Sequence, residues 1–517
     1  MHLKDQDLKQ LNRDYFASLT PEQLVNLADK LLNDLRDARD RQNQTAQNSS
    51  RPSSSYAPWE QAQISDDQEQ SDDSDSQENT EAKRAKDDRG ATESSAADTE
   101  NKADAQKKRK PGRQVGAKGF GRTVKVAMTG EVVHQSAHCG GCGQELGEDA
   151  LFERRTGSYT LDIKKEDLGL EVTNVLHIYG VTRCGCGHWT ESEPGRCAPE
   201  EGWDIEITEW HLIGPTLASL IICLSLRMRQ SRWRIREFLA DWLGIVVSKG
   251  VISKCLAEGG RAAWPLEDEF ITEIQQSELL YVDETGWKEN GKRRWLWVLK
   301  TTTVTYYLIG SRSWQTIADI MENFAGWLMS DGYGQYRNYG QRLRCLAHLI
   351  RKARGVSESC HPEAAAFGQK VLEIINLFIN GIYEARGDPA LDLMARYAEK
   401  LAQLKTLCQQ YRDHEHEKTK KLARELLNDW ATIWNVLRYP HLPLTNNLAE
   451  RALRHWVISR KISYGTRTQQ GSRSHAILAS VIDTCRQRHV SPWAYIARVI
   501  AERRQNKPVP SLPDIAV

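Results

Sequence analysis

Three short apolar segments in succession constrain the fold of this chain more than any other feature. They read ELLYVDET (278–285), RRWLWVLKTT (293–302) and VTYYLIGS (304–311), and each is rich in residues that favour strands. Asn290 and Gly291 stand between the first two segments, and an Asn-Gly pair is typical of a two-residue hairpin turn. We therefore predict three consecutive antiparallel strands.

The following part of the chain predicts an alternation of strands and helices. Residues 313–325 have the pattern of a helix capped by Ser313, and GWLMSDGY is expected to form a short strand ending at Asp331. The segment LRCLAHLI is a further strand or the start of a helix. An almost wholly helical stretch over 351–437 follows, and TNNLAERALRHWVISRK then opens a long helix. The sheet is thus expected to be interrupted by a block of helices.

Charge is nearly balanced overall but unevenly distributed. The 517 residues carry 70 Lys and Arg against 69 Asp and Glu, a net charge of +1. Residues 49–104 are acidic and rich in Ser, Gln and Ala, and the segment KKRKPGRQVGAKGFGR after them is strongly basic. Local patches decide nucleic-acid binding, so the neutral total does not argue against it. Few large apolar residues occur over 45–106, which predicts a disordered, flexible tether.

The sequence predicts a cytoplasmic protein without a membrane span. The most apolar run, LIGPTLASLIICLSL, contains Pro215 and is shorter than the ~18–20 residues that a membrane helix needs. The first ten residues are too charged for a secretory signal peptide. Four of the 11 cysteines fall in two close pairs, which indicates a reducing compartment and one metal site rather than a disulfide framework.

A helix is predicted close to the N-terminus. Thr20, Pro21 and Gln23 form a helix start with a capping box. The apolar positions of this helix repeat with heptad-like spacing at Leu24, Leu31, Leu35 and Ala38. Such a seam either joins chains in a homo-oligomer or packs the helix on its own chain.

Two cysteine pairs predict a structural zinc site. Cys139 and Cys142, then Cys184 and Cys186, lie in Gly-rich turns at the two ends of a strand-rich region over about 124–189. Structural Zn²⁺ takes four tetrahedral thiolate or imidazole ligands. The alternative is a set of buried, unliganded cysteines. The C-x-C spacing of the second pair is unusual, so the residues that could replace a ligand are His138, His188 and Cys197.

The segment SRWRIREFLADWLGIVVSKGVISKCL has two apolar-periodic parts joined near Gly244. The second part exposes Ser248, Lys249, Ser253 and Lys254 in this interpretation. The pattern suggests a DNA-binding helix-turn-helix, although plain helical hairpins look alike.

Three separated acids are candidate ligands of a catalytic metal. Asp283 stands at the end of the first predicted strand, Asp331 at the end of a later strand, and Glu450 on the helix after the helical block. Asn446 and Arg454 fall on the same helix face as Glu450. Hard cations such as Mg²⁺ prefer oxygen ligands, and two such ions can serve phosphodiester cleavage and strand transfer. Paired acids at a strand end, Asp283 and Glu284, could equally mark a solvated edge.

Basic residues follow two of these acids. They are Arg344, His348, Arg351 and Lys352 after Asp331, and Arg451, Arg454, Arg460 and Lys461 after Glu450. Such side chains suit a phosphate backbone, and a solvated helix face is the alternative. Trp287, Trp295 and Trp297 could stack on unpaired bases, but core packing is the favoured interpretation for most of them.

With these features together, the sequence resembles a transposase of the insertion-sequence sixty-six family, in the DDE group. The resemblance is carried by YVDETGW, by SDGYGQY followed by RCLAHLIRKA, by RKPGRQVGAKG, and above all by LTNNLAERALRHWVISRKISYGTRTQQGSRSHAILASVIDTCRQRHVSPWAYI. It covers nearly the whole chain except the acidic linker. Where the family commonly has DNN, this chain has Thr445-Asn446-Asn447, a difference at the start of the catalytic helix that leaves the acid in place.

The resemblance implies a ribonuclease-H-like catalytic domain with Asp283 on the central first strand, Asp331 after the fourth and Glu450 on the helix after an all-helical insertion. It implies two Mg²⁺ or Mn²⁺ ions at these acids and a structural Zn²⁺. The implied partners are the terminal repeats of a mobile element, target DNA, further copies of the chain and small accessory proteins. The residues expected to contact DNA are Arg109, Lys110, Arg113, Lys249, Lys254, Arg351, Lys352, Asn446, Asn447, Arg451, Arg454, Arg460 and Lys461.

The expected fold class is multidomain α+β. Its parts are a leucine-rich N-terminal helical segment (1–44), a disordered acidic linker ending in a basic arm (45–110), a zinc-ribbon-like β module (111–200), a helical part with the helix-turn-helix (201–275), a catalytic core in two parts (276–350 and 441–490) around the helical insertion (351–440), and a C-terminal tail (491–517).

Three other functions remain to be weighed against a transposase. One is a DNA-binding protein derived from such an enzyme that has lost catalysis. Another is a ribonuclease-H-like nuclease that cuts without joining. A glycosidase with paired carboxylates is the most distant, since only scattered Trp residues could suggest a sugar site.

Overall fold

The computed structural model describes residues 11, 13–44, 126–166, 169–192, 196–197, 207–208, 213–388 and 391–515. The predicted linker over 45–110 and the basic residues Arg109, Lys110 and Arg113 lie outside the described residues.

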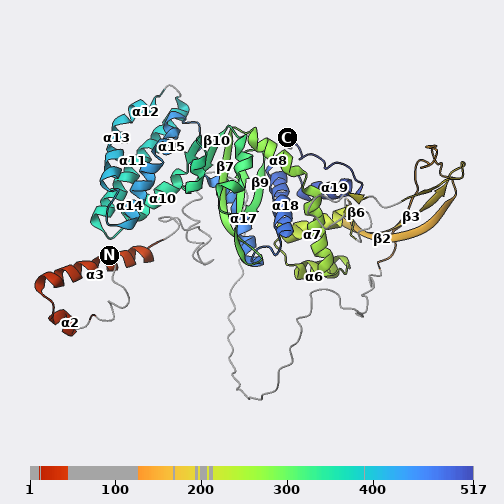
Figure 1. Cartoon of the computed structure of the whole chain (residues 1–517), viewed down its shortest axis with the longest axis horizontal. Helices are drawn as coiled ribbons and strands as arrows, with labels where there is room; N and C mark the ends of the chain where they lie inside the picture. Colours follow the sequence, from red (N-terminus) through yellow and green to blue (C-terminus); the bar gives the residue numbers. More distant parts are fainter. Residues whose placement is uncertain are drawn as a thin grey trace, which may run out of the picture. The chain divides into compact units, whose positions relative to one another are not determined.

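A five-stranded mixed sheet forms the centre of the fold (Figure 1). Its strands are β7 (Leu279–Glu289), β8 (Lys292–Lys300), β9 (Thr305–Gly310), β10 (Trp327–Ser330) and β11 (Arg342–Arg344). The strand order is β11-β10-β7-β8-β9, with β7, β8 and β9 antiparallel and β10 parallel to both of its neighbours. The prediction of three consecutive antiparallel strands is therefore confirmed, and β7 is central.

The hairpin between β7 and β8 turns at the predicted Asn-Gly pair. Asn290 and Gly291 have φ values of 49° and 76°, as the type I′ turn of a two-residue hairpin requires. The strand is longer than expected, because β7 does not end at Asp283 but continues to Glu289. Residues 285–289 pair with 292–296 of β8, and Trp287 is buried there, so the paired acids lie within a strand and not at its end.

Two predictions on the segments around β10 need correction or completion. The helix expected over 313–325 is a 3-10 turn (η2, Trp314–Thr316) and a short helix α9 (Ala318–Glu322). Ser313 stands at the N-cap position of η2, but its side chain makes no capping hydrogen bond and instead contacts the hydroxyl of Ser311 at 2.9 Å. The segment LRCLAHLI is both a strand and a helix start: β11 ends at Arg344 and α10 begins at Leu346.

Seven of the described helices lie beside the sheet. They are α5 (Pro215–Leu226), α6 (Arg232–Leu243), α7 (Lys249–Ala263), α8 (Leu266–Gln275), α17 (Asn447–Ser463), α18 (Gln469–Gln487) and α19 (Pro492–Arg504). Some of them pack on the sheet: helix α17 packs on β7 and β8, and α18 packs on β9. Helix α5 contacts β2 (Phe152–Glu166) of the β module. The predicted two-helix unit is present: α6 ends at Gly244, whose φ of 65° is left-handed, and Ser248 caps α7.

The two ends of helix α7 differ in exposure. Lys249 and Lys254 near its N-terminal end are exposed. Its C-terminal part, from Glu258 to Ala263, is buried and packs against α5, α18 and α19. A side chain at Gly260 would collide with Ser474 of α18 at 2.4 Å, which explains glycine at this close approach.

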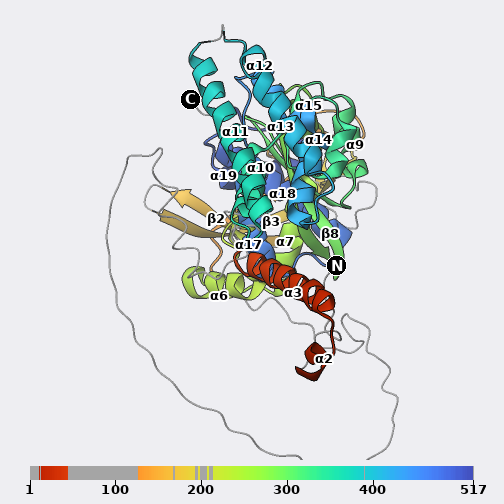
Figure 2. The same ribbon diagram turned by 90° about the vertical axis from the view of Figure 1, so that its left-hand side faces the viewer.

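The predicted helical block is present between β11 and α17 (Figure 2). Its members are α10 (Leu346–Ser357), α11 (Pro362–Gly387), α12 (Leu393–Arg396), α13 (Ala398–Gln410), α14 (Glu417–Asn428), α15 (Trp430–Ile433) and α16 (Asn435–Arg438). Ion pairs fix it to the sheet: Arg344 of β11 is fully buried and pairs with Glu425 and Asp429 next to the end of α14.

Two further parts complete the described chain. The N-terminal helices are α2 (Arg13–Ala17) and α3 (Pro21–Gln42), and the capping box of Thr20 and Gln23 is present. The β module has β1 (Gly130–His134), β2 (Phe152–Glu166), β3 (Gly169–Arg183) and β4 (Trp189–Glu191), with a two-stranded pair β5 (Arg196–Cys197) and β6 (Ile207–Thr208). Among the described helices, none is long and apolar enough to cross a membrane.

Candidate active site

Sheet topology brings the two candidate aspartates to neighbouring strands. Asp283 lies within β7, and Asp331 is the first residue after β10. The parallel pairing of β10 with β7 aligns Met329 with Tyr281, so Asp331 and Asp283 follow at the same distance beyond this pair. The two carboxylates therefore stand at the same level of adjacent strands.

The third acid, Glu450, lies in the first turn of α17. Side chains alternate along a strand, so Asp283 and Thr285 share a face of β7, and Thr285 is bonded by Arg460 of α17. Asp283 thus faces the helix that carries Glu450. Burial raises the pKa of Asp283 well above its usual range, and the nearby charges of Asp331, Glu284 and Glu450 raise it further. Asp331, Glu284 and Glu450 are thus close enough to Asp283 for their charges to disfavour its ionised form.

This crowding predicts that Asp283 destabilises the chain when no cation is bound. The folded chain binds a proton at Asp283 more strongly than the unfolded chain, so stability is lost as pH rises from the usual value of 3.8 through the raised pKa. With EDTA present, Asp283→Asn should stabilise the fold at neutral pH by about 0.5–2 kcal/mol. The gain should shrink on acidification, as measured by thermal unfolding across pH. Asp319→Asn, at an exposed site on α9, should show no such gain. An equal response of both variants would contradict the prediction.

Glu450 has its own set of neighbours. Its Oε1 lies 3.7 Å from Nδ1 of His348 and 3.6 Å from a guanidinium nitrogen of Arg351. Ligand atoms of Cys345, His348 and Glu450 all lie within 4.8 Å of one another, whereas the oxygens of Glu450 and the two aspartates do not form such a group. Oε1 of Glu450 is buried and accepts no hydrogen bond from the described residues. An oxygen in this state suits a bound cation.

The surroundings of His348, one of the basic and polar residues noted after Asp331, favour its neutral form. Burial lowers its pKa to about 3, and the charges of Arg351, Lys352 and Arg344 contribute to the shift. It stands on α10 beside Glu450. Its position next to the third acid could not be inferred from its place after Asp331 in the sequence.

Two contacts fix α17 to β7. Asn446 is fully buried, its side-chain amide donates to the carbonyl oxygen of Val282 at 2.9 Å, and its backbone N–H donates to Sγ of Cys345 at 3.3 Å. Near the other end of the helix, Arg460 donates to Oγ1 of Thr285 at 3.0 Å and to the carbonyl oxygen of Gly286. These side chains hold Glu450 in register with Asp283, and they are engaged within the fold.

Glu284 points to the opposite face of the sheet and has a supporting contact network. The hydroxyl of Tyr336 donates to its carboxylate at 2.5 Å, and Nε of Arg312 donates to it at 2.9 Å. Arg312 also lies over the rings of Trp295 and Tyr333, 4.2 and 4.1 Å from their centroids. The backbone N–H of Tyr333 donates to Oδ1 of Asp331 at 2.7 Å, so this network supports the loop that presents Asp331. Sequence reasoning missed Arg312 and Tyr336, because neither is close to the acids along the chain.

The structure separates the other expected DNA contacts into exposed and engaged side chains. Lys352 pairs with both carboxylate oxygens of Glu425 at 2.9 and 2.7 Å, and Arg351 bonds the carbonyl oxygen of Ala347 at 3.3 Å. The exposed ones are Lys249, Lys254, Asn447, Arg451, Arg454 and Lys461. Of the three tryptophans, Trp287 and Trp297 are buried in the core as favoured, and Trp295 packs against Arg312.

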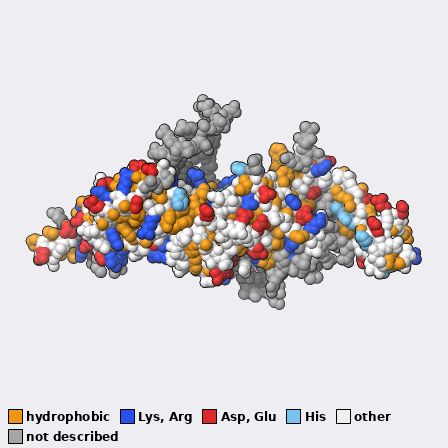
Figure 3. Space-filling model, turned by 90° about the horizontal axis from the view of Figure 1, so that it is seen from above, with side chains coloured by type: hydrophobic (Ala, Val, Ile, Leu, Met, Phe, Trp, Pro, Cys, Tyr) orange, Lys and Arg blue, Asp and Glu red, His pale blue; other side chains and the backbone are white. Residues whose placement is uncertain are grey.

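A basic pocket opens beside Asp331. It has a volume of about 490 Å³ and extends from Gly332 to α10 and α14 of the helical block. Its cationic side chains are Arg337, Lys352, Lys418, Lys421 and Arg424. Figure 3 shows lysine and arginine side chains interspersed with acidic ones on the part of the surface that holds the helical block. The pocket thus gathers cationic side chains beside the loop after β10, and Arg337, Lys352, Lys421 and Arg424 each also pair with a carboxylate.

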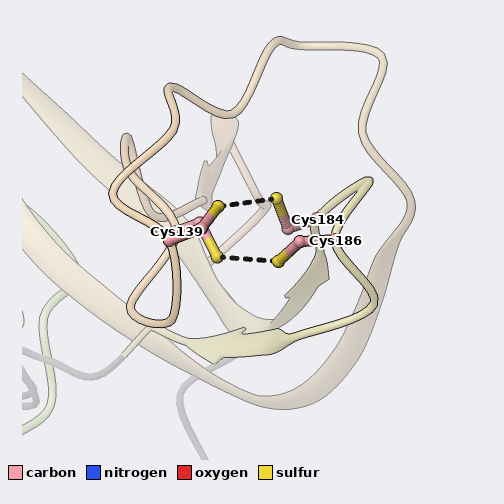
Figure 4. Close-up of side chains that lie close together, drawn as sticks. Cys139, Cys184 and Cys186 are labelled. Carbon is pink, nitrogen blue, oxygen red and sulfur yellow. Dashed lines mark hydrogen bonds between the residues drawn. The ribbon is translucent and has the colours of Figure 1, made fainter.

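The four cysteines of the β module come together in one cluster (Figure 4). Sγ of Cys139 lies 3.7 Å from that of Cys186, and Sγ of Cys142 lies 3.6 Å from that of Cys184. Tetrahedral zinc with Zn–S bonds of ~2.3 Å separates its sulfurs by about 3.8 Å, so the cluster fits a metal. Hydrogen bonds from backbone N–H groups of Cys142 and Gly141 lower the pKa of Cys139 to about 6.

Of the alternative ligands, the two histidines, whose side chains the structure describes, do not join this cluster. His138 and His188 are exposed, and the group of ligand atoms within 4.8 Å of one another contains the four cysteines alone. Gly141 approaches His188 so closely that an added Cβ would stand 2.8 Å from its ring. The side chain of Cys197 lies outside the described residues.

Comparison with known proteins identifies the chain. Residues 211–474, about half of its length, match the model of the family described as "Transposase IS66 family". This range includes the sheet, all three acids and the helical block, and the class of protein is a transposase. The chain belongs to the IS66 family of transposases.

Several curated proteins of Sinorhizobium fredii (strain NBRC 101917 / NGR234) are similar to the chain. The uncharacterized protein y4qI is 23% identical over 51% of this chain and 55% of its own length. The uncharacterized protein y4jD is 24% identical over 78% of this chain and 82% of its own length. The uncharacterized protein y4jO is 25% identical over 33% of this chain and 50% of its own length. The chain thus covers about half the length of two of these relatives.

Proposed function

We propose that the chain is a DDE-type DNA transposase that binds the terminal repeats of an insertion sequence and catalyses metal-dependent cleavage and strand transfer. The observation that carries this proposal is the placement of Asp283 and Asp331 at the same level of two adjacent strands, with Glu450 in the first turn of the helix that packs on β7. Membership of a transposase family gives the substrate class, DNA.

The strand order supports a ribonuclease-H-like catalytic domain. Three antiparallel strands come first and the first of them is central, as the resemblance implied, and β10 and β11 then pair in parallel. In the proposed organisation, the chain has the parts and boundaries expected from the sequence, with residues 351–440 inserted into the catalytic core. It is a cytoplasmic protein that associates with DNA as a homo-oligomer, and accessory proteins of the same element are further partners.

The acids would hold two Mg²⁺ or Mn²⁺ ions. Two features suit divalent cations: Oε1 of Glu450 is buried without a hydrogen bond from the described residues, and burial together with neighbouring acidic charges raises the pKa of Asp283. When bound, such ions supply activation of an attacking oxygen and stabilisation of the leaving oxygen in phosphodiester cleavage.

The chain itself would position the reacting groups. Asn446 and Arg460 hold α17 on β7, and the network of Glu284, Arg312 and Tyr336 supports the loop after β10, so the three carboxylates keep a fixed arrangement. Water would be the first nucleophile, and the freed 3′-OH would then attack target DNA. The pKa of His348 keeps the imidazole beside Glu450 uncharged, so it does not compete with a cation for this carboxylate.

In the proposed complex, the DNA would run from the three acids along nearby cationic side chains. The basic pocket continues from Gly332 along α10 and α14, and Arg451 and Arg454 are exposed on the helix of Glu450. End recognition would involve α7, with exposed Lys249 and Lys254, and the β module. Zn²⁺ held by Cys139, Cys142, Cys184 and Cys186 would stabilise the fold of this module and have no role in catalysis.

An assay on DNA that carries the element's own ends tests this function. The full chain is incubated with end-containing DNA and a target plasmid, with Mg²⁺ or with EDTA. We expect Mg²⁺-dependent cuts at the ends and joined products with the target. Cuts without joining would point to a nuclease, and binding without any metal-dependent cut would point to a DNA-binding protein that has lost catalysis.

A further inference from the structure

A third group of side chains of types that can bind metal lies apart from the cysteine cluster and from the three acids. The helical block contains Cys360-His361 before α11 and His414-Glu415-His416 before α14. Helix α3 presents Asp37 and Asp40 to these histidines. Three segments from different parts of the chain thus meet at one place.

The geometry of this group is compact. Ligand atoms of Asp37, His361 and His416 all lie within 4.8 Å of one another. Nε2 of His361 is 3.1 Å from Oδ1 of Asp37, and Nε2 of His416 is 3.5 Å from Oδ2 of Asp40. Tetrahedral zinc with N and O ligands at ~2.0–2.2 Å places its ligand atoms about 3.2–3.6 Å apart. The 3.1 Å between His361 and Asp37 is close to that edge, and the ligand atom of His416 lies within 4.8 Å of both.

Neighbouring groups orient the ligands. Nδ1 of His416 is 2.8 Å from Oγ1 of Thr419, which fixes the ring and leaves Nε2 toward the acids. Metal-binding histidines commonly use their second nitrogen in this way. Asp40 accepts hydrogen bonds from the hydroxyl of Ser359 at 2.5 Å and from the backbone N–H of Cys360 at 2.9 Å. Its side chain and that of His416 are only 3% and 4% exposed, so the ligands on one side are shielded from water.

We propose that Asp37, His361 and His416 bind a divalent transition-metal ion, with Asp40 as a neighbouring carboxylate whose oxygens are held by Ser359 and Cys360. Two imidazoles and carboxylate oxygen form a ligand set that suits Zn²⁺, and calcium or magnesium would be poorly served by nitrogen ligands. This site is separate from the cysteine cluster and from the catalytic acids, and it does not depend on the proposed reaction.

The bound ion would join the N-terminal helix to the helical block. Asp37 and Asp40 come from the last turns of α3, and the histidines come from the start of α11 and from the residue before α14. Without metal, α3 is held by polar contacts and ion pairs that water and salt weaken. With metal, the contacts of Asp37, His361 and His416 become coordination bonds. The helix α3, with its exposed Leu24 and Leu35, is then held in one position on the helical block.

The experiment measures zinc bound by the full-length chain after removal of metal and reconstitution with Zn²⁺. Asp37→Asn and the double change His361→Gln with His416→Gln should each retain one zinc ion fewer per chain than the wild type, or bind it at least about 100-fold more weakly. Asp29→Asn, at an exposed position of the same helix, is the matched control and should bind as much as the wild type. Reconstitution with Co²⁺ adds a separate readout, because a site without thiolates lacks the intense sulfur-to-metal absorption of the cysteine cluster.

A protection measurement tests the consequence for α3. Zn²⁺ should slow proteolytic cutting within 21–42 in the wild type and in Asp29→Asn but not in Asp37→Asn. Retention of the thiolate absorption in each variant shows that the β module remains folded. Equal zinc content in the wild type, Asp37→Asn and the double variant would overturn the site. Bound zinc at these residues with no change in proteolysis would overturn the joining role.

Discussion

Glu450→Gln should abolish Mg²⁺-dependent cleavage of DNA that carries the element's ends. Glutamine keeps the size of the side chain but removes the negative charge that would hold a cation beside Asp283 and Asp331. A metal ion contributes several kcal/mol to stabilisation of the transition state, so its loss corresponds to a decrease of about a thousandfold or more in rate. The measurement is the initial rate of cutting on labelled end DNA.

Binding of the same DNA should be preserved in this variant. Glu450 is acidic and makes no attractive contact with phosphate, so a gel-shift assay in EDTA should give equal affinities for Glu450→Gln and the wild type. Asp319→Asn, an exposed acid on α9, is the control and should cut normally. Full cleavage activity in Glu450→Gln would sink the three-acid assignment.

Glu258→Ala should destabilise the chain by about 3–5 kcal/mol. Glu258 of α7 and Arg504 of α19 are both buried, and their two hydrogen bonds measure 2.7 and 3.1 Å. Removal of the carboxylate leaves the buried guanidinium of Arg504 without the two hydrogen bonds and the charge of its bonded partner. The measurement is the shift of the unfolding midpoint in urea.

Two further variants test the origin of this loss. Glu502→Ala removes the acid of a more exposed pair with Lys507 at 3.7 Å and should cost less than about 1 kcal/mol. The double change Glu258→Leu with Arg504→Met replaces both charges by apolar groups and should recover a large part of the stability. A double variant as unstable as Glu258→Ala would show that the charge left unpaired is not the cause.

Local sequence signals predicted the central sheet well. The Asn290-Gly291 pair, the three apolar segments and Asp331 after a short strand all appear where expected, because turn chemistry and strand periodicity act over a few residues. The extension of β7 to Glu289 was missed, since its outer part is polar and becomes a strand only by pairing with β8.

The acids of the candidate site were singled out from the sequence, but the residues that hold and surround them were not. Asp283, Asp331 and Glu450 were recognised through the elements that carry them, and their assignment as ligands stays a prediction. The burial of Asn446, the neutral state of His348 and the contact of Arg312 with Glu284 follow from packing between segments far apart in the chain. Local patterns do not carry such information.

The continuity of α7 has a consequence for how such a mobile element can change over time. One end of this helix is exposed, and the other is built into the core beside α18. If α7 binds the recognised bases, this one helix connects them to the core that holds the carboxylates. The distance between the recognised bases and the site of cleavage would then be fixed by the fold. Displacing the recognised sequence by about five base pairs would turn it to the opposite side of the double helix. The number of base pairs between the recognised sequence and the cut would then change only when the fold of the enzyme changes.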